Sequence, residues 1–379
     1  MKAKEFREEI NRTLIRENMT CERTLKACEV LLKRLSEGCY DAKLEKIRDF
    51  LPFTGNGKVY ISDEISNLIN SDILRERLKK ELPPGREPLG VLLHIGAGNV
   101  PGLGAYSVIE GLLAGNINIL KPASVDAPIS GFILRELVKA EPELKPYIYM
   151  FEIPSTHASA VPKLKELISL SDAVSVWGGD RTIKAVRELA GADKKLIEWG
   201  HKFSFVYISR AGLKDRAAIK DLAKHIQDTG MRLCSSCQTV YVEGGSKEDM
   251  RLLREELNAS LKQGPDIKDA AETLRRYTEK LMSELPAGSG EEERYDFLGC
   301  PLISADREDM PERLRADSHS LQTVGLICVG DEEEELSRLF IRAGATRIRR
   351  PSEMSAYIPG EAHDGKFPLY EYTKRAEYL

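Results

Sequence analysis

The stretch GMRLCSSCQTVYV, residues 230–242, places Cys234 and Cys237 three residues apart, directly before an expected strand. A tetrahedral zinc site needs about four Cys or His ligands. Neither the other five cysteines nor the six histidines form a second pair at matching spacing. We therefore expect no metal centre at these cysteines.

Three other possibilities remain for the two cysteines: a redox dithiol, a pair of small buried residues, or a thiolate nucleophile. Redox dithiol motifs usually open a helix, whereas Cys237 leads into the expected strand QTVYV. The small polar residues Ser235 and Ser236 lie at the junction of two expected α/β regions. Clefts at such junctions commonly bind ligands, which favours a nucleophile.

Two glycine-containing turns between a strand and a helix could present backbone amides to a ligand. HIGAGNVPG places Gly96 and Gly98 after an expected strand, at a spacing that differs from the dinucleotide-binding fingerprint. VWGGD places Gly178 and Gly179 after another strand, with Asp180 as the expected N-cap of the next helix. Either pair could simply serve a tight turn, but two such corners together favour a nucleotide site.

Three polar residues stand beside these turns, and each has two interpretations. Asn99 could donate a hydrogen bond to a developing oxyanion or cap the following helix. Lys121 ends the strand NINILK, at the edge where open α/β sheets bind ligands, or it is a solvated surface lysine. Glu198 follows the short strand KKLI and could be a general base or a carboxylate at the rim.

The elements that must position these residues alternate regularly. Residues 1–50 have a helical pattern, and the Pro/Gly-rich stretch at 82–90 precedes the main sheet. Apolar strands and amphipathic helices then alternate, which predicts mostly parallel sheets with helices on both faces. Strands are expected at 90–95, 116–123, 147–153, 172–179, 203–208, 238–245, 300–304 and 323–330, and helices at 99–115, 127–140, 157–170, 180–191, 214–229 and 247–261. A charged helix at 267–284 and an exposed loop at 285–296 are also expected.

Composition excludes several classes of protein. The chain of 379 residues has a formal net charge of −4, so no basic excess is present to neutralise nucleic acid. No apolar run approaches the roughly 18 residues of a membrane span, and the charged N-terminus is unlike a signal peptide. Seven irregularly spaced cysteines indicate reduced thiols, not a disulfide framework. We expect a soluble cytoplasmic protein.

Five motifs in order resemble the aldehyde dehydrogenase superfamily: EPLGVLLHIGAGNVP, GNINILKPAS, VWGGDRTIKAVRE, IEWGHKFSFVYI and CSSCQTVYV. Within it, CSSCQ, SLQTVGL and HDGKFPLYEYTKR are most similar to the LuxC-type fatty acyl-CoA reductases. The resemblance runs from about residue 87 to the end and implies two Rossmann-like α/β domains with the active site in the cleft between them. Residues 1–200 would hold the N-terminal helices and the nicotinamide cofactor, 201–358 the nucleophile, and 359–379 a tail that could serve oligomerisation.

The resemblance also implies catalytic roles for single residues. It places the nucleophile at Cys234, eight residues before Val242, and leaves Cys237 as a spectator or a resolving thiol. Asn99 matches the oxyanion donor, together with the backbone amide of Cys234. Glu198 matches the residue that acts as base in hydrolytic aldehyde dehydrogenases.

The expected cofactor residues follow in the same way. Lys121 matches the lysine that contacts the cofactor ribose, Gly178 with Gly179 the glycine corner under the cofactor, and Gly96 belongs to the other corner. Ser124 stands where NAD-preferring members often carry a glutamate, so a 2′-phosphate meets no like charge and we expect NADPH over NADH. The Glu-x-Phe-Gly-Pro stretch that contacts the nicotinamide ribose has no clear match, and HSLQTVG at 319–325 is its candidate equivalent.

The implied reaction is the reduction of an acyl-CoA or another acyl thioester. Cys234 attacks the thioester, coenzyme A leaves, and hydride from NADPH gives an aldehyde. The alternatives are a hydrolytic aldehyde dehydrogenase that forms a carboxylic acid, and a non-catalytic member of the same fold. The superfamily also implies a homo-oligomer.

Overall fold

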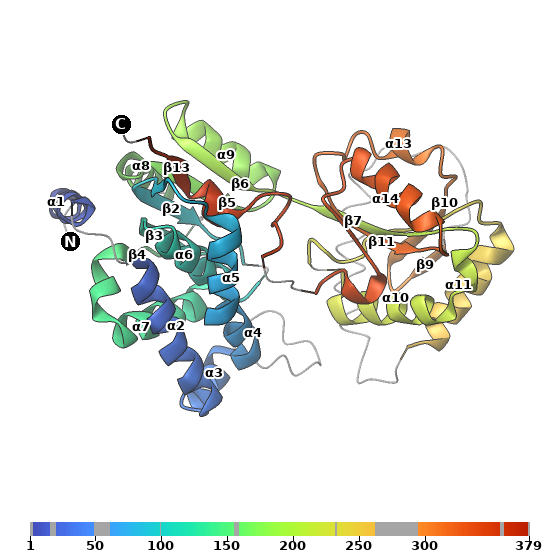
Figure 1. Cartoon of the computed structure of the whole chain (residues 1–379), viewed down its shortest axis with the longest axis horizontal. Coiled ribbons are helices and arrows are strands. Elements are labelled where there is room, and N and C mark those ends of the chain that lie inside the picture. Colours follow the sequence, from blue (N-terminus) through green and yellow to red (C-terminus); the bar gives the residue numbers. More distant parts are fainter. Residues whose placement is uncertain are drawn as a thin grey trace. The chain divides into compact units, whose positions relative to one another are not determined.

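The computed structural model describes residues 3–15, 20–48, 61–98, 100–154, 159–231, 233–261, 295–356 and 360–377. The chain divides into two compact units. The first comprises Met1–Thr54, Lys58–Gly200 and Ile358–Leu379, and the second comprises Gly55–Gly57 and His201–Tyr357. Each unit contains a mostly parallel sheet with helices packed on it, which confirms the predicted α/β class (Figure 1).

The sheet of the first unit has five parallel strands in the order β4 (Ile148–Met150), β3 (Ile117–Lys121), β2 (Val91–Ile95), β5 (Ala173–Trp177) and β6 (Lys195–Trp199). The chain builds outward from β2 through β3 to β4, then returns to the other side of β2 for β5 and β6. The order therefore reverses between β2 and β5. The crevice at the carboxyl ends of two such strands is the usual ligand site of open α/β sheets.

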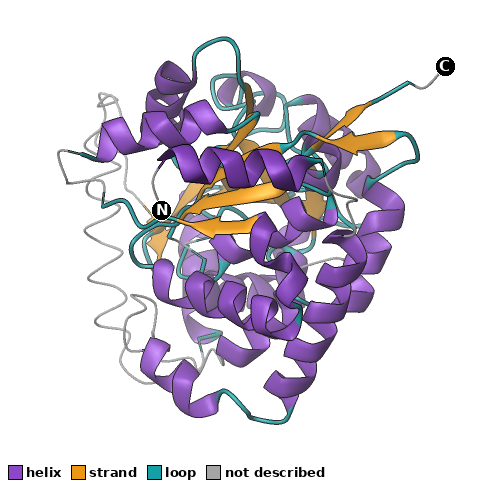
Figure 2. Cartoon of the chain, turned by 90° about the vertical axis from the view of Figure 1, so that its left-hand side faces the viewer, coloured by secondary structure: helices purple, strands orange, loops and turns teal. Residues whose placement is uncertain are grey.

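Helices cover this sheet and extend beyond it (Figure 2). Residues of β2 are buried along its whole length, which is typical of a strand covered on both faces. Val91, Leu93 and Ile95 join the main core, whereas Leu92 packs with a second cluster that contains Trp199. The helices of the first unit before the tail are α1 (Ala3–Leu14), α2 (Thr20–Ser36), α3 (Asp41–Arg48), α4 (Ile61–Leu68), α5 (Ser71–Glu81), α6 (Leu103–Leu113), α7 (Ala127–Ala140), η1 (Pro142–Tyr147), α8 (Ala160–Leu170) and α9 (Asp180–Ala190).

The residues after 358 return to the first unit. Helix α15 (Pro368–Glu371) precedes Tyr372, and β13 (Thr373–Arg375) pairs antiparallel with β1 (Arg86–Pro88). Tyr372 is fully buried, and its hydroxyl lies 3.1 Å from Ser107 Oγ and 3.0 Å from Ser175 Oγ. The tail thus completes the core of its own unit. Its part in oligomerisation stays a prediction.

The sheet of the second unit has six strands in the order β12 (Arg347–Arg349), β11 (Leu321–Ile327), β7 (Phe203–Ile208), β8 (Val240–Val242), β10 (Cys300–Ser304) and β9 (Tyr295–Phe297). All neighbours are parallel except β9, which is antiparallel to β10. Val206 and Ile208 of β7 face one apolar cluster, and Phe205 and Tyr207 face another. The helices of this unit are η2 (Gly212–Lys214), α10 (Arg216–Thr229), α11 (Lys247–Ala259), α13 (Met310–Arg313), α14 (Glu332–Arg342) and η3 (Pro351–Glu353).

Several sequence expectations differ from the structure. The three-residue strands β9, β12 and β13 were not expected, because three residues are too few to establish a period. The charged helix at 267–284 lies outside the described residues. Of the expected loop at 285–296, only 295–296 are described, and they begin strand β9. Among the described residues, no helix has the length and apolar character that a membrane crossing requires.

Candidate active site

The turn that carries Cys234 lies in the second unit, between helix α10 and strand β8. It is closed on itself, because the backbone N–H of Leu233 donates to Ser236 Oγ at 2.9 Å and that of Ser236 donates to the Leu233 carbonyl at 3.0 Å. Cys234 is half-buried, whereas Cys237 is fully buried. Of the two sequence candidates, Cys234 is therefore the cysteine that a substrate can reach.

Two contacts fix this turn to the elements around it. Ser204 of β7 donates through Oγ to the Cys234 carbonyl at 2.7 Å. The backbone N–H of Cys237 donates to Nε2 of His225 on α10 at 3.1 Å. Burial lowers the pKa of His225 to about 4, so the imidazole is neutral near pH 7 and Nε2 can accept. The turn is thus held from a strand on one side and a helix on the other.

The Cys234 sulfur has a polar neighbour that sequence reasoning did not place there. Nε2 of Gln322, at the start of β11, lies 3.3 Å from Cys234 Sγ. Gln322 belongs to the stretch 319–325 that we expected to contact a cofactor. No spacing pattern relates two residues that are 88 positions apart. The contact follows from the sheet order, in which β7 separates β11 from β8.

Cys237 has a different environment from Cys234. Its sulfur lies 3.3 Å from the Thr239 carbonyl and 3.9 Å from the sulfur of Cys300, which is also fully buried. The neighbouring Cys237 thiol and burial raise the pKa of Cys300 well above its usual value. Cys237 therefore packs in the core of the second unit against another thiol. Its role as a resolving thiol stays a prediction.

In the first of the two glycine corners, in the first unit, several backbone amides already have partners within the protein. The Gly96 N–H donates to the Lys121 carbonyl at 2.9 Å. Helix α6 begins after Gly102, which has a positive φ of 81° that glycine adopts readily. The N–H groups of Gly102 and Gly104 both donate to the carboxylate of Asp126, at 2.6 and 3.2 Å. A carboxylate of the protein itself therefore occupies the N-terminus of α6.

The second corner is open by comparison. The Gly178 N–H donates to the Trp199 carbonyl at 3.2 Å. The N-cap of helix α9 is Gly179 and not Asp180, as we expected; Asp180 is the first residue of the helix, and no side chain caps it. A side-chain carbon placed on Gly179 would meet no atom within 4 Å. An uncapped helix N-terminus attracts anionic groups, because its N–H groups and its dipole point toward them. This corner fits a phosphate-containing cofactor better than the first corner does.

Lys121 stands at the same edge of the sheet, at the end of β3. It is half-buried, and its ammonium has no hydrogen-bond or ion-pair partner in the part of the chain that the structure describes. Burial lowers its pKa. A desolvated cation of this kind gains stability from polar or anionic ligand oxygens. Ser124 follows in an exposed position, and Asn99 lies outside the described residues.

Glu198 differs from the sequence expectation. We expected it after a short strand, but β6 continues through Glu198 to Trp199, which pairs with Trp177. Arg187 of α9 holds its carboxylate in a two-pronged ion pair, with Nη2 at 2.6 Å from Oε1 and 2.7 Å from Oε2. Both carboxylate oxygens thus accept hydrogen bonds from Arg187.

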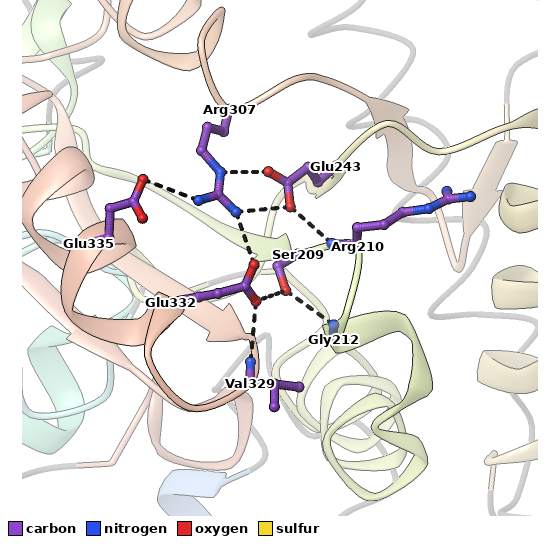
Figure 3. Close-up of polar contacts among 8 residues, drawn as sticks. All are labelled: Ser209, Arg210, Gly212, Glu243, Arg307, Val329, Glu332 and Glu335. Carbon is purple, nitrogen blue, oxygen red and sulfur yellow. Dashed lines mark hydrogen bonds and ion pairs between the residues drawn. The ribbon is translucent and has the colours of Figure 1, made fainter.

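The carboxyl edge of the second sheet is filled by side chains instead. There the strand order reverses between β7 and β11, and Arg307 donates to Glu243 at 2.6 Å, Glu332 at 3.0 Å and Glu335 at 3.1 Å (Figure 3). Ser209, directly after β7, donates to the other oxygen of Glu332 at 2.7 Å. A phosphate at this edge would meet carboxylates, which repel it. The edge suited to an anionic cofactor is therefore that of the first unit.

Comparison with known proteins identifies the family of the chain. A family model described as acyl-CoA reductase (LuxC) matches residues 60–295 and 301–375. The chain is similar to long-chain acyl-protein thioester reductase 2 of Photobacterium leiognathi, with 23% identity over 87% of this chain and 76% of that protein. It is also similar to the long-chain acyl-protein thioester reductase of Vibrio harveyi, with 24% identity over 76% of this chain and 64% of that protein. The chain thus spans less than two thirds of the Vibrio harveyi relative.

Solved structures show the same fold. An NAD-dependent aldehyde dehydrogenase from Sinorhizobium meliloti matches with a TM-score of 0.66 and 17% identity, over 98% of this chain and 86% of that one. An E. coli NADP dependent enzyme matches with a TM-score of 0.69 and 16% identity, over 99% of this chain and 89% of that one. At these identities the likeness establishes the aldehyde dehydrogenase fold and nothing further.

Proposed function

The chain belongs to the acyl-CoA reductase (LuxC) family, and we propose that it reduces an acyl thioester to an aldehyde through an acyl-enzyme intermediate on Cys234. Membership of this family makes it an oxidoreductase that acts on acyl or aldehyde groups. The observation that carries the proposal is the Cys234 turn. It presents one half-buried thiol, beside an amide donor, on a turn held by Ser204 and His225.

The first step is a transfer of the acyl group between two sulfur atoms. The Cys234 thiolate attacks the carbonyl carbon of the acyl thioester and forms a new C–S bond. The C–S bond of the substrate then breaks, and its electron pair leaves with the departing thiolate. For the tetrahedral oxyanion, we keep the role that the resemblance implies for Asn99 and the backbone amide of Cys234. In related sites, the loss of one such donor costs about 3–4 kcal/mol.

The second step requires a nicotinamide cofactor, which supplies a hydride when bound. The residues of the first unit fit such a group, because the open corner at Gly179 can receive phosphate oxygens and Lys121 offers a cation without a partner among the described residues. Ser124 in place of a carboxylate supports NADPH over NADH, since a 2′-phosphate would meet no like charge there.

Reduction is favoured over hydrolysis by the state of Glu198. A hydrolytic enzyme needs a carboxylate free to take a proton from water. In this structure Arg187 engages both oxygens of Glu198. We infer that this ion pair makes Glu198 less available as the base that the hydrolytic alternative assigns to it.

The substrate acyl group is carried by the thiol of either a protein or coenzyme A. The two relatives are named as acyl-protein thioester reductases. We propose acyl-CoA as a substrate as well, because the thioester chemistry at Cys234 is the same for either donor. A cytoplasmic location and a homo-oligomeric assembly stay predictions from the sequence.

Mass spectrometry after incubation with acyl-CoAs of short, medium and long chain tests the proposal. We expect a mass increase equal to one acyl group, located on Cys234, and its loss on addition of NADPH with release of an aldehyde. Cys234→Ala should abolish the adduct, whereas the matched variant Cys237→Ala should keep it. An adduct on another residue, or free acid as the main product, would contradict the proposal.

A further inference from the structure

The contact between Gln322 and the nucleophile sulfur is well placed for a hydrogen bond. Nε2 of Gln322 lies 3.3 Å from Cys234 Sγ, which is within the range for a donor to sulfur. The Gln322 side chain is almost completely buried, with 5% of the residue exposed. A buried amide is shielded from competing water, so its hydrogen bond to a charged sulfur is stronger than it would be on the surface.

The orientation of the Gln322 side-chain amide follows from the contacts of its oxygen, Oε1. The hydroxyl of Thr323 donates to Gln322 Oε1 at 3.5 Å. The same hydroxyl accepts a hydrogen bond from Nε of Arg347 at 2.9 Å, and Nη2 of Arg347 donates to the Met354 carbonyl at 2.7 Å. Because Arg347 can only donate, the Thr323 hydroxyl accepts from it and keeps its own proton available for Oε1. The amide nitrogen, with its protons, therefore faces Cys234.

Hydrogen bonds of the backbone keep the Gln322 side chain close to the Cys234 sulfur. The N–H of Thr323 donates to Ser204 Oγ at 3.0 Å, and Ser204 Oγ donates in turn to the Cys234 carbonyl at 2.7 Å. Thr323 and Ser204 are both fully buried. The Gln322 carbonyl also accepts from Thr346 N–H at 3.0 Å. The start of β11 and the Cys234 turn are thus connected through one side chain of β7, which limits their relative movement.

We propose that Gln322 is a catalytic residue of the reaction on Cys234, where its side-chain amide donates a hydrogen bond to the thiolate. This inference rests on the proposed function and gives Gln322 a role at the sulfur, beyond the cofactor contact that the sequence predicts for the stretch 319–325. The bond stabilises the sulfur as an anion before it attacks the acyl carbon. It does so again when the thiohemiacetal, formed on Cys234 once the acyl carbon has gained a hydride, loses its C–S bond, so that the aldehyde leaves and the electron pair returns to sulfur. The positive charge of Arg347, at the far end of the same hydrogen-bond chain, polarises the amide in the same sense.

Alkylation of Cys234 by iodoacetamide across a range of pH measures this effect without any substrate. Only the thiolate reacts, so the midpoint of the rate profile reports how readily the sulfur ionises. Gln322→Met removes the donor at similar length, and Gln322→Glu keeps the shape but puts a carboxylate beside the sulfur. Gln227→Met, on the half-buried part of α10, is the matched control. Fragmentation of the labelled peptide separates Cys234 from Cys237, and exposed Cys39 is an internal reference.

We expect Gln322→Met to move the midpoint upward by about one pH unit, because hydrogen bonds to charged groups are among the stronger ones. Alkylation near neutral pH then slows by roughly tenfold. Gln322→Glu should move the midpoint further in the same direction, and Gln227→Met should leave it unchanged. A profile for Gln322→Glu that coincides with that of the unmodified protein would overturn the inference, even if Gln322→Met fails to fold.

Failure of the proposed function gives a different result. If the alkylation profile of Cys234 shifts as expected but Cys234 takes up no acyl group from any thioester, the hydrogen bond from Gln322 is supported and the proposed reaction at Cys234 is wrong. If Cys234 is acylated and no variant shifts its alkylation profile, the function stands and Gln322 has no part in ionising the sulfur.

Discussion

Acidification should loosen the Cys234 turn through His225. Burial lowers the pKa of this imidazole to about 4, whereas in the unfolded chain it titrates near 6.5. Between these two pKa values the imidazole is protonated in the unfolded chain but not in the folded protein. The free energy of unfolding therefore falls as the pH falls from the higher pKa to the lower one. From about pH 7 to about pH 5, the loss due to His225 alone is about 1.8 kcal/mol. Nε2 of His225 accepts a hydrogen bond from the Cys237 N–H, so protonation of His225 weakens a contact that holds the Cys234 turn.

The variant His225→Gln isolates this contribution, because the glutamine oxygen can accept the same N–H but does not titrate. Labelling of the buried thiols Cys237 and Cys300 by a thiol reagent reports opening of the second unit. The opening free energy of the unmodified protein should fall by about 1.8 kcal/mol more than that of the variant between the two pH values. Buried His94, whose pKa is also lowered to about 4, is present in both proteins and cancels. Equal pH dependence of the two proteins would refute the reasoning.

Three further predictions follow from single contacts. Arg187→Met removes the ion-pair partner of the Glu198 carboxylate, so the share of free acid among the products of the acyl-enzyme should rise by about tenfold or more. Chromatography of the products measures this share, and Arg181→Met on the same helix is the control. Ser124→Glu places a negative charge where a 2′-phosphate is expected, and should reduce the ratio of kcat/KM for NADPH to that for NADH by roughly tenfold, with no change if the cofactor lies elsewhere. Asp126→Ala leaves the N–H groups of Gly102 and Gly104 without their acceptor, and should reduce the free energy of unfolding by about 2 kcal/mol in urea titrations followed by circular dichroism.

The prediction of the fold from sequence succeeded where an element is long and its burial leaves a local pattern. The strand expected at 90–95 is β2 (Val91–Ile95), and the helix expected at 127–140 is α7 (Ala127–Ala140). A strand buried on both faces must be apolar throughout, and a helix on a sheet must be apolar on one side. Three-residue strands show too little of either pattern. Strands β12 and β13 can be identified only from their pairing with β11 and β1.

The sequence by itself determined which residues could do chemistry and at which edge of each sheet they stand. Cys234 precedes β8, Lys121 ends β3, and the glycine corner follows β5, because these positions depend only on neighbours along the chain. Order and spacing of the motifs were enough to indicate the family, which comparison then confirmed.

Only the tertiary structure decided what each of these residues contacts. It placed Asp126 on the N-terminus of α6 and left α9 uncapped, which separates two corners that look alike in sequence. It paired Arg187 with Glu198, and brought Gln322 to Cys234 across 88 residues. Such contacts depend on the order of the strands, which follows from how whole helices and strands bury their apolar surfaces together. Local periodicity, spacing and composition contain no record of that order.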